Sequence, residues 1–222
     1  MKNKTLITAH TGADNYPDNS LEFVRHAVAS EADAFEIDIR KRADGVLIIA
    51  HDPDVQDAPT LREVFEIARS NPRIQINCDL KNDGLELEVL DLVRAFGYEG
   101  RIVYSGTVNV AVLRANPDLQ DAVTVYLNLE AYVDDLYNRF REIPDFDRTA
   151  AEQIIEICQA CNIQVVNSNH SILTGRFIDL LRAVGIGVSA WTVNEYADVS
   201  RLIQQEVYNL TTRNLAMVME RF

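Results

Sequence analysis

Short apolar runs alternate with amphipathic stretches along the chain, and this alternation restricts the fold more than any other feature. Runs rich in valine, isoleucine and aromatic residues are typical of buried parallel strands. The eight runs are Leu6–His10, Ala34–Arg40, Ile74–Leu80, Ile102–Ser105, Ala122–Leu129, Gln164–Asn169, Gly187–Val193 and Tyr208–Thr212. Stretches between them show helical spacing, as Leu21, Val24 and Val28 do. The chain therefore repeats a strand–helix unit.

Eight such units in 222 residues predict an α/β fold, a closed (β/α)8 or TIM barrel, with one domain over residues 1–222. An open doubly wound sheet is the alternative. It is disfavoured because no G-x-G-x-x-G pattern follows the first strand. A hairpin is also expected after the second strand, with a turn at Arg42–Gly45 and a returning strand at Val46–Ala50. That hairpin would carry His51 back to the same end of the barrel.

The net charge of the chain and the shortness of its apolar runs argue against nucleic acids and membranes as partners. A net charge of −13 argues against a nucleic acid or an anionic membrane surface as the main partner. No run reaches the roughly 18 apolar residues that a membrane span requires. The apolar run after Met1–Lys4 is too short for a signal peptide. We therefore expect a cytoplasmic protein without membrane insertion, and the sequence leaves its oligomeric state open.

Carboxylates lie near the carboxyl ends of predicted strands, where barrel active sites are found. Glu36 and Asp38 lie late in the second strand, and Asp79 lies at the end of the third. Because Glu36 and Asp38 are two residues apart, they face the same side of their strand, where burying both unpaired would be costly. The three oxygen donors together suit one Mg²⁺ or Ca²⁺ ion.

Basic side chains flank these carboxylates. His10 ends the first strand and His51 follows the hairpin, and both could transfer protons near neutral pH because imidazole titrates there. Lys81 shares a strand face with Asp79 and could hold an anionic group beside the ion. His170 ends the sixth strand and could touch a substrate, although a loop histidine without a role is the favoured interpretation. Each residue alone is commonly a solvated charge, but their joint position favours a functional site.

These residues resemble the pattern of the glycerophosphodiester phosphodiesterase family. That family opens with His-Arg-Gly, followed by Pro-Glu-Asn-Thr, Glu-x-Asp, an Asp-Gly turn and His-Asp. The corresponding segments here are His10-Thr11-Gly12, Pro17-Asp18-Asn19-Ser20, Glu36-Ile37-Asp38, Asp44-Gly45 and His51-Asp52. Further along, a family Glu-x-Lys, a Trp-Thr-Val-Asn and, faintly, a closing Thr-Asn-Arg-Pro are similar to later segments. These are Asp79-Leu80-Lys81, Trp191-Thr192-Val193-Asn194 and Thr211-Thr212-Arg213-Asn214.

The resemblance implies a TIM barrel that hydrolyses a small phosphodiester with the help of one Mg²⁺ or Ca²⁺ ion. A glycerophosphodiester-like substrate would yield an alcohol and a phosphomonoester such as glycerol 3-phosphate. Which histidine is the general acid and which the general base stays open. The implied site consists of the acid–base pair His10 and His51, the metal ligands Glu36, Asp38 and Asp79, the substrate-binding Lys81 and Trp191, and the orienting residues Asp52 and Asn19.

The chain departs from the family pattern in ways that affect substrate recognition. Thr11 replaces the family arginine, which removes one phosphate-facing cation. Asp18 and Asp79 stand where the family has glutamate, so each side chain is shorter by one methylene. The family carries an inserted subdomain after its His-Asp, whereas only Pro53–Pro59 precedes the next helix here. We therefore expect a more open active-site mouth.

Two other functions fit the same residues. A weakly catalytic or noncatalytic barrel that binds a phosphorylated small molecule is one of them, motivated by Thr11 and the missing insertion. Another metal-dependent barrel enzyme, such as an aldolase or an epimerase, is the second. That class usually needs a Schiff-base lysine or further metal-binding histidines at strand ends. Lys81 is the only lysine predicted at such a position, and the carboxylates beside it would keep it protonated and poorly nucleophilic.

Overall fold

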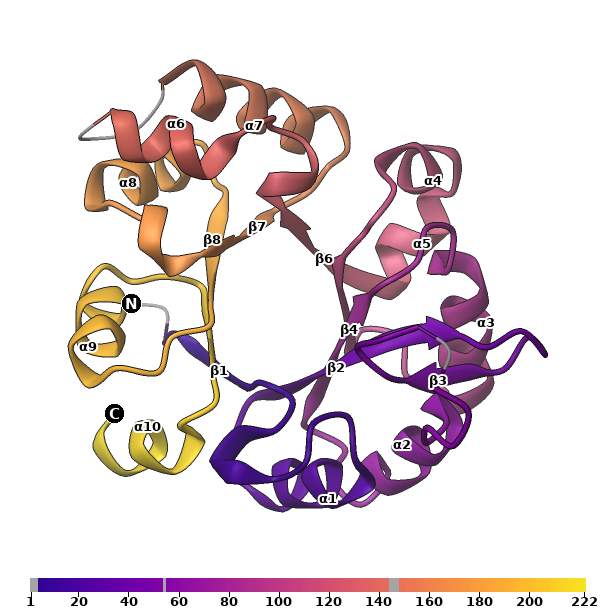
Figure 1. Cartoon of the computed structure of the whole chain (residues 1–222). Helices are drawn as coiled ribbons and strands as arrows, with labels where there is room; N and C mark the ends of the chain where they lie inside the picture. Colours follow the sequence, from indigo (N-terminus) through magenta and orange to yellow (C-terminus); the bar gives the residue numbers. More distant parts are fainter. Residues whose placement is uncertain (1–3, 54, 144–147) are drawn as a thin grey trace.

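A closed parallel barrel organises the structure, a computed structural model that describes residues 4–53, 55–143 and 148–222. Residues 1–3 of the N-terminal stretch, and residue 54 in the segment after Asp52, lie outside the described residues. The parallel strands are β1 (Leu6–Ala9), β2 (Ala34–Lys41), β4 (Gln75–Leu80), β5 (Ile102–Gly106), β6 (Val123–Asn128), β7 (Val165–Asn169), β8 (Gly187–Trp191) and β9 (Asn209–Thr212). Because β1 pairs with both β2 and β9, the sheet closes on itself (Figure 1).

The predicted (β/α)8 barrel is therefore confirmed, and the open doubly wound sheet is wrong. Each of the eight predicted strands is present, with ends that differ by at most two residues from those expected. Most of the apolar residues that marked these runs belong to the main hydrophobic core, as Phe35, Ile37 and Ile39 of β2 do, while Val103, Tyr126 and Val165 form a separate buried cluster. Burial of this apolar surface supplies the main driving force for the fold.

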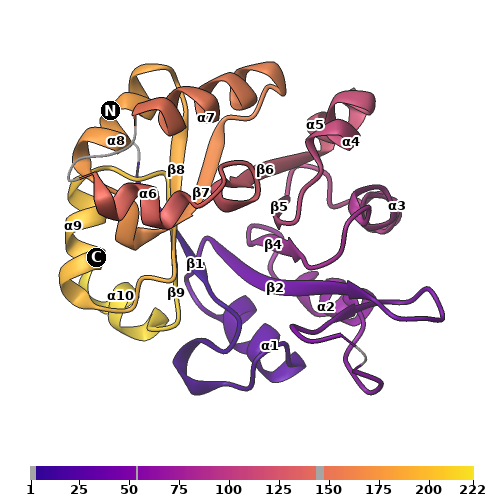
Figure 2. The same ribbon diagram turned by 45° about the horizontal axis from the view of Figure 1, so that its top comes forward.

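Helices surround the strands on the outside (Figures 1 and 2). They are α1 (Leu21–Ala29), α2 (Leu61–Ala68), α3 (Glu86–Phe96), α4 (Val110–Ala115), α5 (Pro117–Ala122), α6 (Leu136–Glu142), α7 (Arg148–Ala160), α8 (Gly175–Ala183), α9 (Tyr196–Gln204) and α10 (Leu215–Arg221). Short 3-10 turns are η1 (Ala13–Asn15), η2 (Leu129–Ala131) and η3 (His170–Ile172). Within the described ranges, none of the helices combines the length and the apolar character needed to cross a membrane.

The predicted hairpin after β2 is also present. Its returning strand, β3 (Leu47–Ile49), pairs antiparallel to β2, with Ile49 opposite Ile39. Gly45 in the turn has a φ of +87°, a conformation that glycine adopts without strain. The Ala50 N–H donates to the Asp38 carbonyl at 3.0 Å. This contact brings the chain, and with it His51, back beside the carboxyl end of β2.

Polar side chains link neighbouring strands inside the barrel. The Thr8 hydroxyl of β1 donates to Asn209 Oδ1 of β9 at 2.7 Å, and Asn209 Nδ2 donates to the Ser189 hydroxyl of β8 at 3.0 Å. All three residues are buried. Buried polar groups are tolerated when they are hydrogen-bonded to one another, so these contacts stabilise the closed ring.

Helix α2 begins with a reciprocal cap that follows directly from the sequence. The Thr60 hydroxyl accepts from the Glu63 N–H at 3.2 Å, and the Glu63 carboxylate accepts from the Thr60 N–H at 2.8 Å. Hydrogen bonds from the Thr60 N–H and hydroxyl lower the pKa of Glu63. The cap fixes the start of α2, whose buried Leu61 and Val64 pack into the core.

Replacing Thr60 with alanine should therefore lower the free energy of unfolding by about 1 kcal/mol, because the Glu63 N–H loses its acceptor. Urea denaturation followed by circular dichroism measures this change. Thr60→Ser keeps the hydroxyl and should stay within a few tenths of a kcal/mol of the wild type. Equal stability of Thr60→Ala and wild type would contradict a stabilising cap.

Candidate active site

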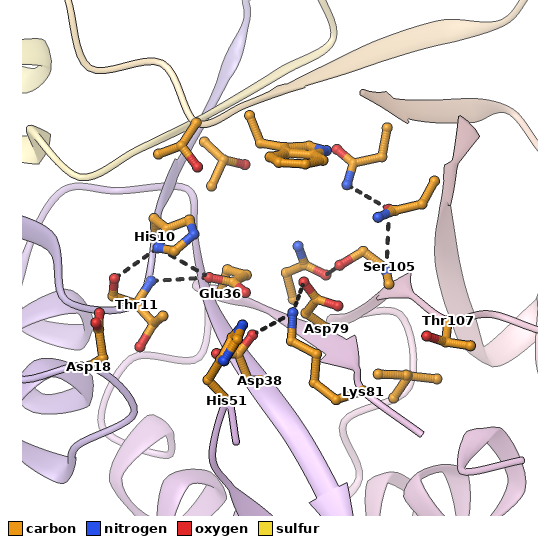
Figure 3. Close-up of a pocket in the computed structure, with 18 of the residues that line it drawn as sticks. His10, Thr11, Asp18, Glu36, Asp38, His51, Asp79, Lys81, Ser105 and Thr107 are labelled. Atoms are coloured by element: carbon orange, nitrogen blue, oxygen red, sulfur yellow. Dashed lines mark hydrogen bonds and ion pairs between the residues drawn. The ribbon is translucent and has the colours of Figure 1, made fainter. Parts of the chain in front are cut away.

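A cavity of about 600 Å³ opens at the carboxyl ends of the strands (Figure 3). A volume of this size suits a small ligand. The lining includes seven residues singled out from the sequence: His10, Glu36, Asp38, His51, Asp79, Lys81 and Trp191. The other two, Asn19 and Asp52, lie outside the lining and contact residues within it. The barrel thus brings together residues that are far apart in the chain.

Three carboxylates cluster at one side of the cavity. One oxygen from each of Glu36, Asp38 and Asp79 lies within 4.8 Å of those from the other two. The parallel register sets Asp38 of β2 opposite Asp79 of β4, which explains how they meet. Burial, reinforced by the charges of Asp38 and Asp79, raises the pKa of Glu36 well above its ordinary value. The cluster is therefore electrostatically strained.

Lys81 relieves part of this strain. Its ammonium lies 2.9 Å from Asp38 Oδ1 and 3.0 Å from Asp79 Oδ2. Burial alone would lower the pKa of Lys81, but the charges of Asp79 and Asp38 outweigh burial and raise it. Three ionised carboxylates and one ammonium leave a formal charge of −3 + 1 = −2. One divalent cation would cancel this charge.

The donor set suits a hard divalent cation. Carboxylate oxygens are the preferred ligands of Mg²⁺ and Ca²⁺. Asp79 Oδ1 is buried and, among the described residues, has no hydrogen-bond partner. A Cβ at Gly106 would lie 1.9 Å from this oxygen, so only glycine leaves room beside it. The cluster could therefore hold a metal ion, with Asp79 Oδ1 available as a ligand.

His10 is oriented by the backbone of its own loop. Its Nδ1 lies 2.8 Å from the Thr11 carbonyl oxygen, which can only accept, so Nδ1 carries the proton. Glu36 Oε2 lies 3.7 Å from the same nitrogen and accepts from the Thr11 N–H at 3.1 Å. Burial lowers the pKa of His10 below its ordinary value. The neutral ring therefore has an unprotonated Nε2.

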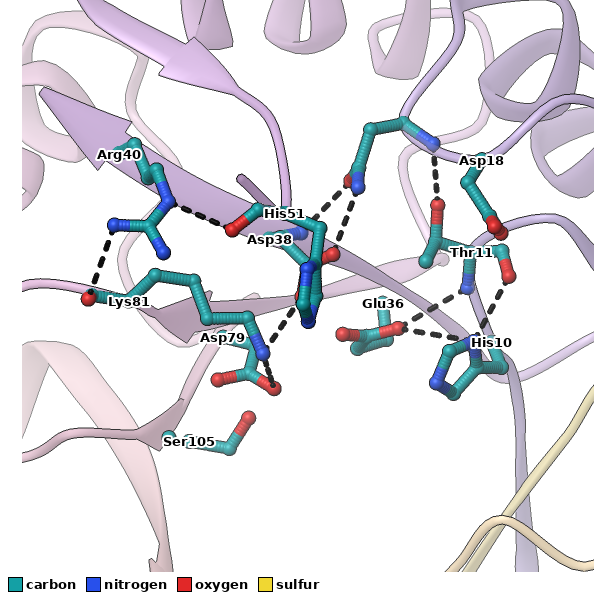
Figure 4. A network of polar contacts seen from close by, with 12 residues as sticks. His10, Thr11, Asp18, Glu36, Asp38, Arg40, His51, Asp79, Lys81 and Ser105 are labelled. Atoms are coloured by element: carbon teal, nitrogen blue, oxygen red, sulfur yellow. Dashed lines mark hydrogen bonds and ion pairs between the residues drawn. The ribbon is translucent and has the colours of Figure 1, made fainter. Parts of the chain in front are cut away.

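His51 differs from His10 in its exposure. Its side chain is 70% exposed, and its Nδ1 lies 2.9 Å from Asp52 Oδ1, a carboxylate that accepts from Nδ1–H. The Arg40 Nε donates to the His51 carbonyl at 2.7 Å and fixes the backbone there. Figures 3 and 4 show Glu36 between the two imidazoles. The two histidines therefore lie on either side of Glu36, one member of the carboxylate cluster.

Asn19 holds Asp38 in place from behind the cavity. Its Nδ2 donates to Asp38 Oδ2 at 2.7 Å, and its Oδ1 accepts from the Asp38 N–H at 3.0 Å. The Asn19 N–H donates in turn to the Thr11 hydroxyl at 2.6 Å. Asn19 has a φ of +49°, a conformation that asparagine tolerates better than most residues. Thr11 thus supports the loop that positions a candidate metal ligand.

Several lining residues were missed by the sequence analysis. Facing the carboxylates, hydroxyl and amide side chains form a second wall, with Ser105 donating to Asn77 at 2.9 Å and Asn167 donating to Asn128 at 2.8 Å. Ser105 and Asn128 lie late in their strands, as the predicted residues do, and this position is a signal that could have found them, whereas Asn77 and Asn167 lie in the middle of theirs. Arg213, after β9, also lines the cavity.

His170 is placed differently from the other candidates. It lies outside the cavity lining, and its Nδ1 is 3.8 Å from Asp198 Oδ1. The position agrees with the interpretation of this residue as a loop histidine.

The fold and the site together define a class of (β/α)8 barrels with an acidic, histidine-flanked mouth. The model of the glycerophosphoryl diester phosphodiesterase family matches residues 10–72, the stretch that carries His10, Glu36, Asp38 and His51. A glycerophosphodiester phosphodiesterase of Bacillus altitudinis is 29% identical over 140 residues, which cover 46% of this chain and 57% of that protein. The chain therefore spans little more than half the length of this curated relative. It likewise spans 58% of the length of a second curated glycerophosphodiester phosphodiesterase.

Solved structures show the same architecture over nearly the full chain. A glycerophosphodiester phosphodiesterase from Parabacteroides distasonis has a TM-score of 0.76 at 17% identity, covering 99% of this chain and 97% of that one. A phosphodiesterase from Oleispira antarctica, solved with its product sn-glycerol-3-phosphate, has a TM-score of 0.73 at 17% identity, covering 98% and 96%. These likenesses establish the fold. The family match over residues 10–72 and the names of the curated relatives bear out the resemblance of this chain to the glycerophosphodiester phosphodiesterase family.

The charge of Glu36 should govern both stability and cation binding. In the metal-free protein, Glu36→Gln should be more stable than wild type at neutral pH, because the folded state raises the pKa of Glu36 and penalises its ionised form. This advantage should be lost as the pH falls through the folded-state pKa, where the wild-type carboxyl takes up a proton. Chemical denaturation in EDTA across the acidic range measures the difference.

Glu36→Gln should raise the stability of the metal-free protein but weaken the stabilisation that a bound cation provides. Ca²⁺ or Mg²⁺ at about 100 times its Kd should stabilise the wild type by about 2.7 kcal/mol, and Glu36→Gln should reduce this gain. Glu88→Gln, at an exposed residue paired with Lys41, is the matched control and should alter neither quantity. Equal responses to the cation in Glu36→Gln and wild type would rule out Glu36 as a ligand.

A glycine substitution can separate the contribution of the Asn19 side chain, which holds Asp38, from that of its backbone conformation. Asn19→Gly keeps the positive φ and removes the amide that holds Asp38, so divalent-cation affinity should fall about 10- to 100-fold. Asn15→Gly is the matched control, since Asn15 has a φ of +67° and lies outside the cavity lining. Titration calorimetry compares the two variants. An unchanged Kd in Asn19→Gly would show that Asp38 needs no such support.

Proposed function

We propose that this protein hydrolyses a phosphodiester, such as a glycerophosphodiester, to an alcohol and a phosphomonoester. One observation carries the proposal: within a single cavity, two imidazoles flank Glu36 of the carboxylate cluster, each with its Nδ1 engaged and with no partner at Nε2 among the described residues. Proton donors and acceptors on either side of an anion-stabilising centre are what displacement at phosphorus requires. The names of the relatives agree with this activity.

Lys81 would bind the substrate phosphate. An ammonium has three N–H donors, and Asp38 and Asp79 occupy two of them. The third donor can reach a phosphate oxygen in the cavity that Lys81 lines. The raised pKa of Lys81 keeps the group cationic at neutral pH. The two carboxylates thus orient the ammonium toward the ligand.

His10 would act as the general base and His51 as the general acid. Burial lowers the pKa of His10, so its Nε2 is free to take a proton from the attacking water oxygen. His51 Nδ1 is engaged by Asp52, which leaves Nε2 to deliver a proton to the departing alcohol oxygen. The exposure of His51 also allows it to exchange protons with solvent between turnovers.

The carboxylate cluster and Trp191 complete the site. A Mg²⁺ or Ca²⁺ ion held by Glu36, Asp38 and Asp79 would supply Lewis-acid stabilisation of the charge that develops on the phosphoryl oxygens. The Trp191 ring lines the cavity and would pack against the alcohol part. Its buried Nε1–H has no hydrogen-bond partner within the described part of the chain.

Hydrolysis of bis-p-nitrophenyl phosphate and of glycerophosphocholine tests this function. His10→Ala and His51→Ala should each lower kcat about 10²- to 10⁴-fold, because each removes one proton-transfer group. EDTA should abolish turnover, and added Mg²⁺ or Ca²⁺ should restore it. His170→Ala is the matched control and should retain activity, because His170 lies outside the cavity lining.

Turnover that resists EDTA, or that is unchanged in His10→Ala and His51→Ala, would overturn the proposal. A wild-type protein that binds a phosphomonoester but cleaves neither substrate would instead favour the noncatalytic barrel.

A further inference from the structure

Arg213 follows β9 directly, and its backbone is fixed at the cavity edge. Its N–H donates to Asn194 Oδ1 at 2.9 Å, and its carbonyl accepts from the Asp14 N–H at 2.8 Å. Its guanidinium pairs with Asp18, with Nη2 3.0 Å from Oδ1 and Nη1 3.4 Å from Oδ2. Arg213 and Asp18 both line the cavity. The pair joins residues that are 195 positions apart in the sequence.

The loop after His10 is shaped around this pair. Gly12 has a φ of +74°, and a Cβ there would lie 2.0 Å from Asp18 Oδ1 and 3.2 Å from Arg213 Nη1. Only glycine therefore allows the ion pair to pack against the loop. Figure 4 shows Asp18 on the His10 side of the site, away from Lys81. The guanidinium thus lies near the imidazole rather than near the carboxylate cluster.

The guanidinium is accessible and, within the described part of the chain, retains donors beyond those that contact Asp18. The Arg213 side chain is 41% exposed, although it lines the cavity. A guanidinium has five N–H donors, and the two contacts with Asp18 use two of them. The remaining donors can reach an anion at the cavity edge. Asp18 limits the rotation of the long side chain, so less conformational entropy would be lost when the anion binds.

The charge of the lining also points to a role for Arg213. Among the described residues that line the cavity, the permanent cations are Lys81 and Arg213. Lys81 already contacts Asp38 and Asp79, on the carboxylate side. Thr11 supplies no charge, and its hydroxyl accepts from the Asn19 N–H. An anionic substrate near His10 therefore has one cation on that side of the lining, Arg213.

We propose that Arg213 binds a phosphate oxygen of the substrate on the His10 side of the cavity, and that Asp18 positions its guanidinium. The inference rests on the proposed function for the identity of the ligand as a phosphodiester. Two cations would then hold the phosphate from different sides, Lys81 beside the carboxylates and Arg213 beside His10. Arginine suits this role because its planar fork matches two oxygens of a phosphate group.

Binding of inorganic phosphate to the Ca²⁺-loaded protein tests the proposal without relying on turnover. Arg213→Gln should weaken phosphate affinity about tenfold, as expected for the loss of a charge-assisted hydrogen bond. Arg213→Lys keeps the charge and should recover part of the affinity. Arg42→Gln is the matched control, because Arg42 also pairs with an aspartate, Asp44, but lies outside the cavity lining. Titration calorimetry measures each Kd, and thermal melts confirm that each variant folds.

Asp18→Asn tests the positioning role and provides a second variant. The guanidinium keeps its charge but loses its orienting carboxylate, so KM for bis-p-nitrophenyl phosphate should rise several-fold with little change in kcat. A purely structural ion pair would instead change the melting temperature and leave the phosphate Kd and KM unchanged. That result, or equal phosphate affinity in Arg213→Gln and wild type, would overturn the proposal, as would undetectable phosphate binding by the wild type.

The two proposals fail in different ways. A wild type that binds phosphate through Arg213 but cleaves no phosphodiester would overturn the hydrolytic function and support the assignment of Arg213. If the wild type hydrolyses phosphodiesters and Arg213→Gln does so with the same KM, the hydrolytic function is supported and the assignment of Arg213 is overturned.

Discussion

Repulsion among three buried carboxylates is the constraint on which the rest of the site depends. Glu36, Asp38 and Asp79 meet because β2 and β4 pair in parallel and in register. Carboxylates this close are costly to ionise away from water, and the raised pKa of Glu36 reflects that cost. The surrounding contacts offset part of it, chiefly through the Lys81 ammonium. The residual negative charge is what makes a divalent cation the natural complement of this site.

The loop between β1 and α1 connects this cluster to the rest of the cavity. Asn19 holds Asp38, and the Thr11 hydroxyl holds Asn19, so the loop fixes a candidate metal ligand from behind. The same loop orients His10 through the Thr11 carbonyl and leaves space at Gly12 for Asp18 and its arginine. A change in this loop would therefore affect the position of His10, of the candidate metal ligands Glu36 and Asp38, and of Arg213 together.

The sequence predicted most of the fold because strand and helix patterns are local. The hairpin after β2 was also predictable, since Asp44-Gly45 favours a tight turn between two apolar runs. The carboxylates and histidines could be found because each lies at a strand end and has a distinctive chemistry. Asn128 and Arg213 lie at or just after strand ends too, but amides and arginines are common there and lack a distinctive chemistry, and Arg213 stood out only through a faint similarity to a family motif.

The sequence by itself determined which segments become strands, which face of each helix is apolar and which side chains can bind a cation or move a proton. These properties depend on residues that are neighbours in the chain. Only the tertiary structure decided that Asp38 faces Asp79 with Lys81 beside both, and that Arg213 reaches Asp18. The physical reason is closure of the barrel: β1 pairs with β9 as well as β2, so the two ends of the chain meet at one mouth.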